Sequence, residues 1–212
     1  MKRILLYLAG LALASSTLVA QDSRGVIVIN GGRDSVAMSS KPATHWVKPV
    51  GKPFYSNLTT AYQCSTGETL SDGSPVNTEW TQGNVFKSAK TGTTKKITVA
   101  IGFVTGTNAA TVTLDKDCKG QPCGKPDGKP ALCTGHIKNL PVFGQSCTVT
   151  TSFKCVATLT KGHKYWVYAQ TLANSWDAWE WNGAGATTRA YVTDDNLPWT
   201  VDTSTQGAFS VQ

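Results

Sequence analysis

The chain of 212 residues carries little charge and has no long apolar run after its first twenty residues. Charged residues make up 16% and apolar residues 40%, a balance that excludes an intrinsically disordered tail. No later segment is apolar over the length that a membrane-spanning helix needs, so we expect no membrane anchor. A helical period longer than two turns is also missing after residue 20, which excludes a helical fold class.

Catalytic signatures are also missing from the sequence. There is no Gly-x-Ser-x-Gly elbow, no His-Glu-x-x-His pair and no phosphate-binding loop. A glycoside hydrolase needs two carboxylates at a set separation. Glu180 with Asp177 or Glu79 would be such a pair, but nothing in the sequence brings these residues together. We therefore expect a protein without catalytic residues or a cofactor.

The first twenty residues have the pattern of a secretory signal peptide. Lys2 and Arg3 form a positive start, an apolar segment covers residues 4–14, and small residues lead to Ala20. We predict cleavage after Ala20, with residues 12–14 as an alternative site. The mature protein then works outside the cytoplasm, where thiols oxidise.

Alternating apolar and polar residues dominate the mature chain. In residues 96–104, Ile97, Val99, Ile101 and Phe103 alternate with small or polar residues, as in a half-buried strand. Similar runs predict further strands at residues 25–30, 109–115, 149–159, 164–170, 187–192 and 208–211. Many short strands with frequent turn residues predict an all-β fold, an antiparallel β-sandwich of jelly-roll type.

Two irregular stretches complete the predicted organisation. Residues 21–53 form a partly irregular N-terminal segment, and residues 54–212 form the β-sandwich domain. Within that domain, residues 115–139 predict a long loop rich in cysteine, glycine and proline. A loop of this length is usually functional or cross-linked.

Six cysteines in an exported chain predict three disulfide bonds. They are Cys64, Cys118, Cys123, Cys133, Cys147 and Cys155. Fifteen pairings are possible, and only spacing gives a hint. Cys147 and Cys155 are placed to face each other across a short hairpin. Two of the three cysteines in the long loop then tie that loop, which leaves the third for Cys64.

Two metal sites are alternative interpretations of the same loop. Cys118, Cys123, Cys133 and His136 offer the ligand set of a structural zinc site, although an oxidising compartment favours disulfides. A loose calcium site would use side chains of the same loop. Its candidate ligands are Asp115, Asp117 and Asp127.

A cluster of tryptophans is the best candidate for a binding surface. Its members are Trp176, Asp177, Trp179, Glu180, Trp181 and Asn182. Indole rings stack on the apolar faces of sugars, while carboxylates and amides bind their hydroxyl groups. If residues 179–182 are extended, Trp179 and Trp181 share one face and Glu180 and Asn182 share the other. The alternative is that the indoles belong to the core.

Net charge adds a second, weaker hint about partners. The formal charge is +7, and removal of Lys2 and Arg3 with the signal peptide leaves +5. A solvated basic surface explains this value, and binding to an acidic polysaccharide or an anionic cell surface is the more specific explanation. No recognition motif accompanies the charge, so we expect no nucleic-acid partner.

Several short motifs resemble a known group of secreted proteins. In chain order they are residues 54–58, 106–108, 112–114, 139–144, 159–166 and 176–182. They resemble the choice-of-anchor proteins, exported bacterial β-sandwich proteins that often carry a C-terminal sorting signal of the PEP-CTERM kind. The resemblance covers residues 54–211 and implies an exported, often surface-associated protein without a known activity. This chain lacks the Pro-Glu-Pro motif of the sorting signal.

Together these observations predict a secreted, non-catalytic β-sandwich protein. Its favoured role is binding a polysaccharide or cell-surface glycan through the tryptophan cluster. A structural or adhesive extracellular protein without a small ligand is the alternative, and a glycoside hydrolase is third.

Overall fold

A computed structural model describes residues 51–58, 63–73, 76–124, 131–145, 150–194 and 197–212, with the backbone alone at 19–21, 26–29 and 63–64. The body of the predicted signal peptide, Cys147 and Asp127 lie outside the described residues. Within the described part the protein contains strands and turns but no helix, and all the paired strands are antiparallel. The predicted all-β class is confirmed.

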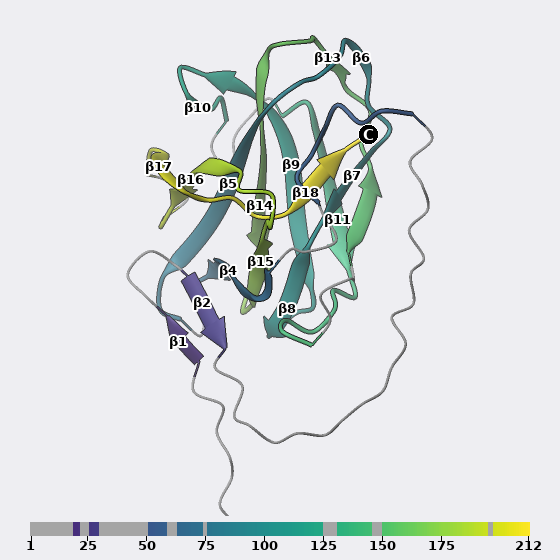
Figure 1. Cartoon of the computed structure of the whole chain (residues 1–212). Helices are drawn as coiled ribbons and strands as arrows, with labels where there is room; N and C mark the ends of the chain where they lie inside the picture. The colour runs from purple at the N-terminus through teal and green to yellow at the C-terminus, as the bar shows by residue number, and fades with distance from the viewer. Residues whose placement is uncertain are drawn as a thin grey trace, which may run out of the picture.

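In the part of the chain that the structure describes, eighteen strands form three sheets (Figure 1). The largest sheet has twelve strands, a second has the order β12-β7-β18-β3, and β13 pairs with β6. The strands are β1 (Val19–Gln21), β2 (Val26–Ile29), β3 (Tyr55–Ser56), β4 (Gln63–Asp72), β5 (Glu79–Lys87), β6 (Gly92–Thr93), β7 (Lys96–Val99), β8 (Ile101–Thr105), β9 (Ala109–Cys118), β10 (Gln121–Pro122), β11 (Cys133–Lys138), β12 (Thr151–Lys154), β13 (Thr158–Leu159), β14 (Lys164–Thr171), β15 (Trp176–Trp181), β16 (Thr187–Val192), β17 (Thr200–Thr205) and β18 (Phe209–Val211).

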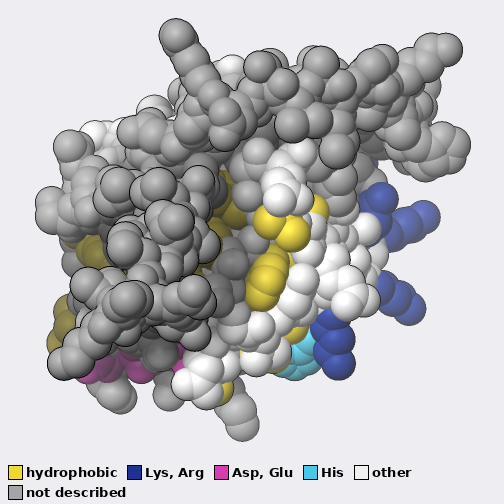
Figure 2. Space-filling view, turned by 90° about the horizontal axis from the view of Figure 1, so that it is seen from below, with side chains coloured by type: hydrophobic (Ala, Val, Ile, Leu, Met, Phe, Trp, Pro, Cys, Tyr) yellow, Lys and Arg dark blue, Asp and Glu magenta, His cyan; other side chains and the backbone are white. Residues whose placement is uncertain are grey.

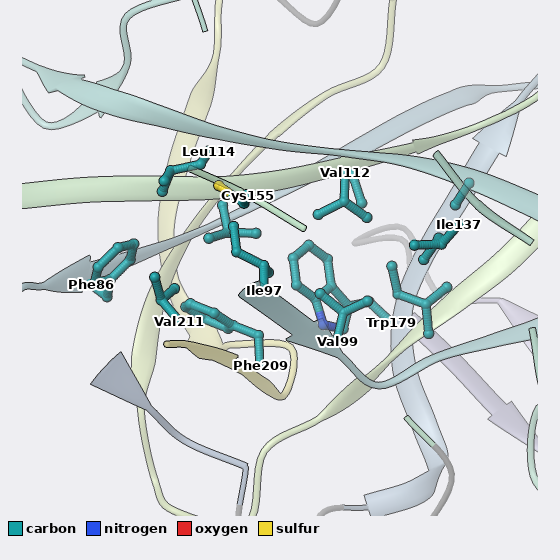
Figure 3. Close-up of a cluster of buried hydrophobic side chains, with 14 of the residues drawn as sticks. Phe86, Ile97, Val99, Val112, Leu114, Ile137, Cys155, Trp179, Phe209 and Val211 are labelled. Carbon is teal, nitrogen blue, oxygen red and sulfur yellow. The ribbon is translucent and has the colours of Figure 1, made fainter. Parts of the chain in front are cut away.

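The main core lies between the four-stranded sheet and the large sheet. Ile97 and Val99 of β7 and Phe209 of β18 contribute from one side (Figure 3). Val112 of β9 and Trp179 of β15 contribute from the other, and all five side chains are buried. Removal of these side chains from water is the main force that holds the two layers of the sandwich together.

The run at residues 96–104 changes sheets at Ala100. Residues before Ala100 form β7 in the four-stranded sheet, and residues after it form β8, which pairs with β15. The Ala100 N–H donates to the Ala208 carbonyl at 3.0 Å, and its carbonyl accepts the Glu180 N–H at 2.8 Å. The prediction of one continuous strand was therefore wrong, because the alternating pattern does not encode which sheet each half joins.

The predicted strand at residues 164–170 is confirmed as β14, and both of its faces are buried. Tyr165 packs in the main core, while Trp166 belongs to a second cluster on the opposite face. The members of that cluster are Trp166, Tyr168, Ala190, Val192 and Trp199. The Trp199 indole N–H donates to the Gly124 carbonyl at 2.8 Å, so the turn after β10 helps to cover this second core.

Two disulfide bonds join described cysteines, and they agree with the spacing hint only in part, since two cysteines of the predicted loop do pair with each other. Cys118–Cys123 closes the β9–β10 hairpin, and Cys133 on β11 pairs with Cys155 after β12. The suggested Cys147–Cys155 pair was wrong, because β11 and β12 pack together and bring Cys133 to Cys155. Four thiols are thereby consumed, which rules out the zinc site.

The predicted loop at residues 115–139 is partly strand. β9 continues to Cys118, β10 turns back along it, and β11 pairs with β9 from Cys133 onward. The left-handed backbone at Lys119 and Gly120 (φ 60° and 92°) makes the tight turn between β9 and β10. Most of the described part of this segment is therefore a disulfide-linked hairpin and an adjoining strand, and not an irregular loop.

We predict that the two disulfides differ in reactivity. Cys118 is exposed and closes a loop with a sequence separation of 5, whereas Cys155 is buried and its bond closes a separation of 22. Exchange requires access of a thiolate to sulfur, so limited reductant should open Cys118–Cys123 first. Alkylation and peptide mass mapping will measure the order, and earlier opening of Cys133–Cys155 would contradict it.

The same mapping without reductant tests the remaining thiols. We predict that denatured, unreduced protein takes up no alkylating reagent, since thiols of an exported protein oxidise in pairs. Cys64 and Cys147 are the two cysteines left for a third bond. Two labelled thiols per chain would show that only two bonds form.

Candidate functional site

Five of the six predicted sugar-binding residues lie on β15, which runs between β4 and β8 in the large sheet, and Asn182 directly follows it. Trp179 is fully buried in the main core, and its indole N–H donates to the Ala208 carbonyl at 3.0 Å. Gly207 lies flat on the ring, where an added Cβ would sit 2.5 Å from an indole carbon. Trp179 is therefore a structural residue and offers no face to a ligand.

Asn182, directly after β15, is also structural. Its amide nitrogen donates to the carbonyls of Ala186 and Gln206 at 2.9 and 2.7 Å. Its amide oxygen accepts the N–H groups of Ala184 and Ala186, each at 3.0 Å. These bonds use the hydrogen-bonding capacity of the side chain to shape the turn before β16.

Trp176 and Trp181 are half-buried, and their indole N–H groups have no acceptor among the described residues. Trp176 packs against Phe143 and Ala178, on a cluster separate from the main core that contains Trp179. The three indoles thus do not form one exposed, coplanar platform. The core interpretation of the cluster is the one that this packing favours.

Asp177 and Glu180 of β15 are buried carboxyl groups with raised pKa values. Burial raises the pKa of Glu180 to about 8, and neither of its carboxylate oxygens has a hydrogen-bond donor among the described residues. Burial likewise raises the pKa of Asp177 to about 8, although the nearby backbone N–H of Val104 lowers it in part. A buried carboxyl group without a donor is more stable when protonated, so both groups are neutral below that pH.

Glu68 is a third buried carboxyl group, which sequence reasoning did not single out. It accepts hydrogen bonds from the Gly207 N–H at 2.9 Å and the Asn84 amide at 3.4 Å. Burial raises its pKa to about 8, and the positive charge of Arg189 opposes that rise. Arg189 itself is paired with Asp202 at 3.2 Å. No local pattern around residue 68 signals this network, because its members come from distant strands.

Two surface grooves lie outside the tryptophan cluster. The first, of about 540 Å³, is lined by Asp72, Gly73, Asn77, Thr78, Glu79, Thr193 and Asp194. The Asp72 carboxylate there accepts the backbone N–H groups of Asn174 and Ser175. Glu79 therefore lies in a groove that contains neither Glu180 nor Asp177, and the pairing considered for a hydrolase is not brought together in either groove.

The second groove, of about 530 Å³, is basic. Its lining residues are Phe54, Lys90, Thr91, Gly92, Thr93, Lys95, Lys96 and Gln212. The Lys90 ammonium lies 4.5 Å from the centre of the Phe54 ring and donates to the Lys52 carbonyl. Lys95 and Lys96 are exposed at the start of β7. No side chain of this lining is acidic, and its three lysines outnumber the one main-chain carboxylate, that of Gln212, whose oxygen accepts the N–H groups of Lys95 and Lys96, so the groove is net positive and suits an anion.

The basic groove belongs to a part of the fold that is poor in acidic residues. Residues 80–114 and residues 128–176 contain no Asp or Glu. These two segments pair with each other through β12–β7, β13–β6, β11–β9 and β14–β5. Figure 2 shows the resulting separation on one face, where Lys and Arg side chains lie on one side and Asp and Glu side chains on the other. The positions of Asp and Glu along the chain are a signal that could have located this groove, whereas the tryptophan-rich segment directed the prediction to β15.

The two described aspartates of the proposed calcium site, Asp115 and Asp117, are used within the protein. Asp115 accepts the N–H groups of Lys116 and Gly124, each at 2.7 Å. Asp117 accepts the Trp166 indole N–H at 2.7 Å and the Gly120 N–H at 3.2 Å. No group of three metal-ligating side chains occurs within the part of the chain that the structure describes.

Comparison of the chain with protein-family models, curated proteins and solved structures finds no match. The resemblance to the choice-of-anchor proteins therefore stays an expectation from short motifs. Across the described residues, no helix has the length and apolar character to cross a membrane. The two disulfides are consistent with folding in an oxidising, extracellular environment.

The buried carboxyl groups predict an unusual dependence of stability on pH. Glu68, Asp177 and Glu180 have folded-state pKa values of about 8, above the ordinary values of 4.5 and 3.8. Between these limits the folded chain holds protons that the unfolded chain has released, so the free energy of unfolding falls as pH rises from about 4 to about 8. Each group contributes at most about 1.4 kcal/mol per pH unit.

Denaturant titrations of Glu180→Gln test this dependence. The amide mimics the protonated acid, so this variant should lose less stability than the parent between pH 5 and pH 8. Ile101→Val is the control, since loss of one buried methylene costs about 0.5–1.5 kcal/mol at every pH. A parent protein whose stability rises over this range would refute the assignment.

Replacement of single tryptophans tests the structural interpretation of β15. Trp179→Ala removes a fully buried indole and should cost about 3–5 kcal/mol. Trp181→Ala removes a half-buried ring and should cost clearly less. Thermal unfolding measures both variants, and equal costs would contradict the difference in burial.

Proposed function

We propose that this chain is an exported, non-catalytic β-sandwich protein that binds an acidic polysaccharide at the cell exterior. The observation that carries the proposal is the groove with three lysines and no acidic side chain. Carboxylate or sulfate groups of a sugar polymer supply the charge that this groove lacks.

An acidic glycan is favoured over a neutral one because two lysines of the groove are exposed to a ligand, whereas the rings of the tryptophan cluster are largely buried. Stacking on neutral sugars needs exposed rings, and Trp179 is buried while Trp176 and Trp181 are half-buried. The lysines at positions 95 and 96 are exposed. Ionic contacts at the groove therefore replace ring stacking at β15 as the basis for binding.

A structural or adhesive protein without a small ligand is the competing function. The buried indoles and the two disulfides suit that role equally well. The lysine-lined groove separates the two functions, since a scaffold has no need for a groove of one charge sign.

Binding to defined polysaccharides tests the proposal. The folded protein should be retained on immobilised polygalacturonate or heparin at 50 mM salt and pass through columns of neutral dextran and cellulose. Contacts of this kind are individually weak and screened by salt, so affinity should be micromolar to millimolar, on the order of 10⁻⁶–10⁻³ M, and fall steeply by about 0.5 M NaCl. Equal retention on neutral and acidic matrices, or none on either, would contradict the proposal.

A further inference from the structure

We infer that the part of the fold that is poor in acidic residues contains a primary anion site. This site is the cross-strand lysine pair Lys96–Lys154 together with Lys90 and Lys95 of the basic groove. This inference rests on the proposed function and specifies the groups that bind. Its ligand is a carboxylate or sulfate group of a linear acidic glycan, held between two ammonium groups from neighbouring strands.

The β7–β12 register places the two ammonium groups together. Lys96 lies directly opposite Lys154, and the Cys155 N–H donates to the Lys95 carbonyl at 3.1 Å just beyond the pair. Residues directly opposite in an antiparallel pair share a face and have Cβ atoms about 4.5–5.5 Å apart. Ile97 beside Lys96 points into the core, so Lys96 and Lys154 point outward and are exposed.

Such a pair is unfavourable in the absence of an anion. Like charges directly opposite each other destabilise a sheet, and a surface lysine is normally relieved by a nearby carboxylate. Neither Lys96 nor Lys154 forms an ion pair with any described residue. Two lysines that repel each other without a neighbouring carboxylate are expected at a site where a bound ligand supplies the negative charge.

A second cross-strand lysine pair lies in the large sheet. Lys87 lies directly opposite Lys164 where β5 meets β14. The turn after β5 runs from Lys87 to the groove, because the Ala89 N–H donates to the Phe54 carbonyl at 2.8 Å and the Ser88 hydroxyl donates to the Lys90 carbonyl at 2.7 Å. Phe86 and Tyr165, the sequence neighbours of this second pair, point into the main core, so Lys87 and Lys164 point outward from the large sheet, on the layer opposite the one that carries Lys96–Lys154. The anion site is therefore assigned to Lys96–Lys154 and the groove alone.

This geometry gives a signature that a general basic surface lacks. Removal of one lysine of the pair relieves repulsion in the free protein and at the same time weakens the site. Lys154→Gln should therefore raise the melting temperature of the free protein at low salt while it lowers affinity. Lys138→Gln, at the end of β11 where Lys138 lies opposite Ala109, is the matched control of equal charge change.

The experiment uses the full mature chain with a heparin hexasaccharide and with a galacturonate trimer as defined probes. Calorimetry should find Lys154→Gln and Lys96→Gln weakened at least about fivefold, a loss of about 1 kcal/mol, and Lys138→Gln within about twofold of the parent. Thermal unfolding at 10 mM salt should show a rise of about 1–3 °C for Lys154→Gln that disappears at 0.5 M salt. Comparison of the two probes tells sulfate from carboxylate as the preferred group.

The outcomes separate this inference from the proposed function. A parent that binds neither these probes nor the acidic polymers overturns the proposed function and this inference with it. Equal losses in Lys154→Gln and Lys138→Gln show binding by diffuse charge, which overturns the site and leaves the function standing. A melting temperature that falls at low salt in Lys154→Gln shows that the pair is not repulsive and also overturns the site. Cooperative unfolding of every variant confirms that the fold is retained.

Discussion

The contact between the Trp179 indole and the Gly207 backbone is the constraint on which the rest of the sandwich depends. The ring fills the centre of the core, and its N–H holds the Ala208 carbonyl. The Gly207 N–H, in turn, donates to Glu68 and to Asn84, from β4 and β5. Any side chain at position 207 would collide with the ring, so the last strand, β15 and the β4–β5 hairpin are positioned by one close approach.

Polar groups near this contact replace part of the apolar core. Glu68 and Asn84 are buried, as are Gln82 and Gln206. Gln206, in the segment that joins β17 to β18, donates to the carbonyls of Val85 in β5 and Thr188 in β16, each at 2.7 Å, and so satisfies these backbone groups. A hydrogen-bonded interior of this kind specifies one arrangement of strands, because each buried donor or acceptor loses its partner in any other arrangement.

The sequence predicted strands best where side-chain period and burial agree. Residues 164–170 and 187–192 were found because apolar and β-branched residues crowd these strands, which match β14 and β16. β4 and β5 were missed, since Thr69, Gln82 and Asn84 are polar residues that only tertiary contacts bury. No local pattern distinguishes such residues from those of a solvated loop.

The candidate site was predictable in chemistry but not in place. Trp179 and Asn182 looked like ligand residues because indole and amide groups serve sugar binding and core packing equally well. Their partners, the Ala208 carbonyl and the turn at residues 182–186, come into contact only in the folded chain. The lysines of the basic groove come from residues 90–96, and only the β7–β12 pairing brings them near Lys154. The Cys133–Cys155 disulfide lies directly after β12 in this pairing.

The edge strand β17 of the large sheet affects whether two copies of the protein can pair strand to strand. β17 pairs with β16 on one side, and its residues are Thr200–Thr205, a run of threonine, serine, valine and Asp202. A register shift between Thr187 and Arg189 interrupts the ladder beside it. A polar border with a charged residue and an irregular ladder is a poor template for another strand. This edge of the large sheet is therefore protected against pairing with a strand from a second copy of the chain.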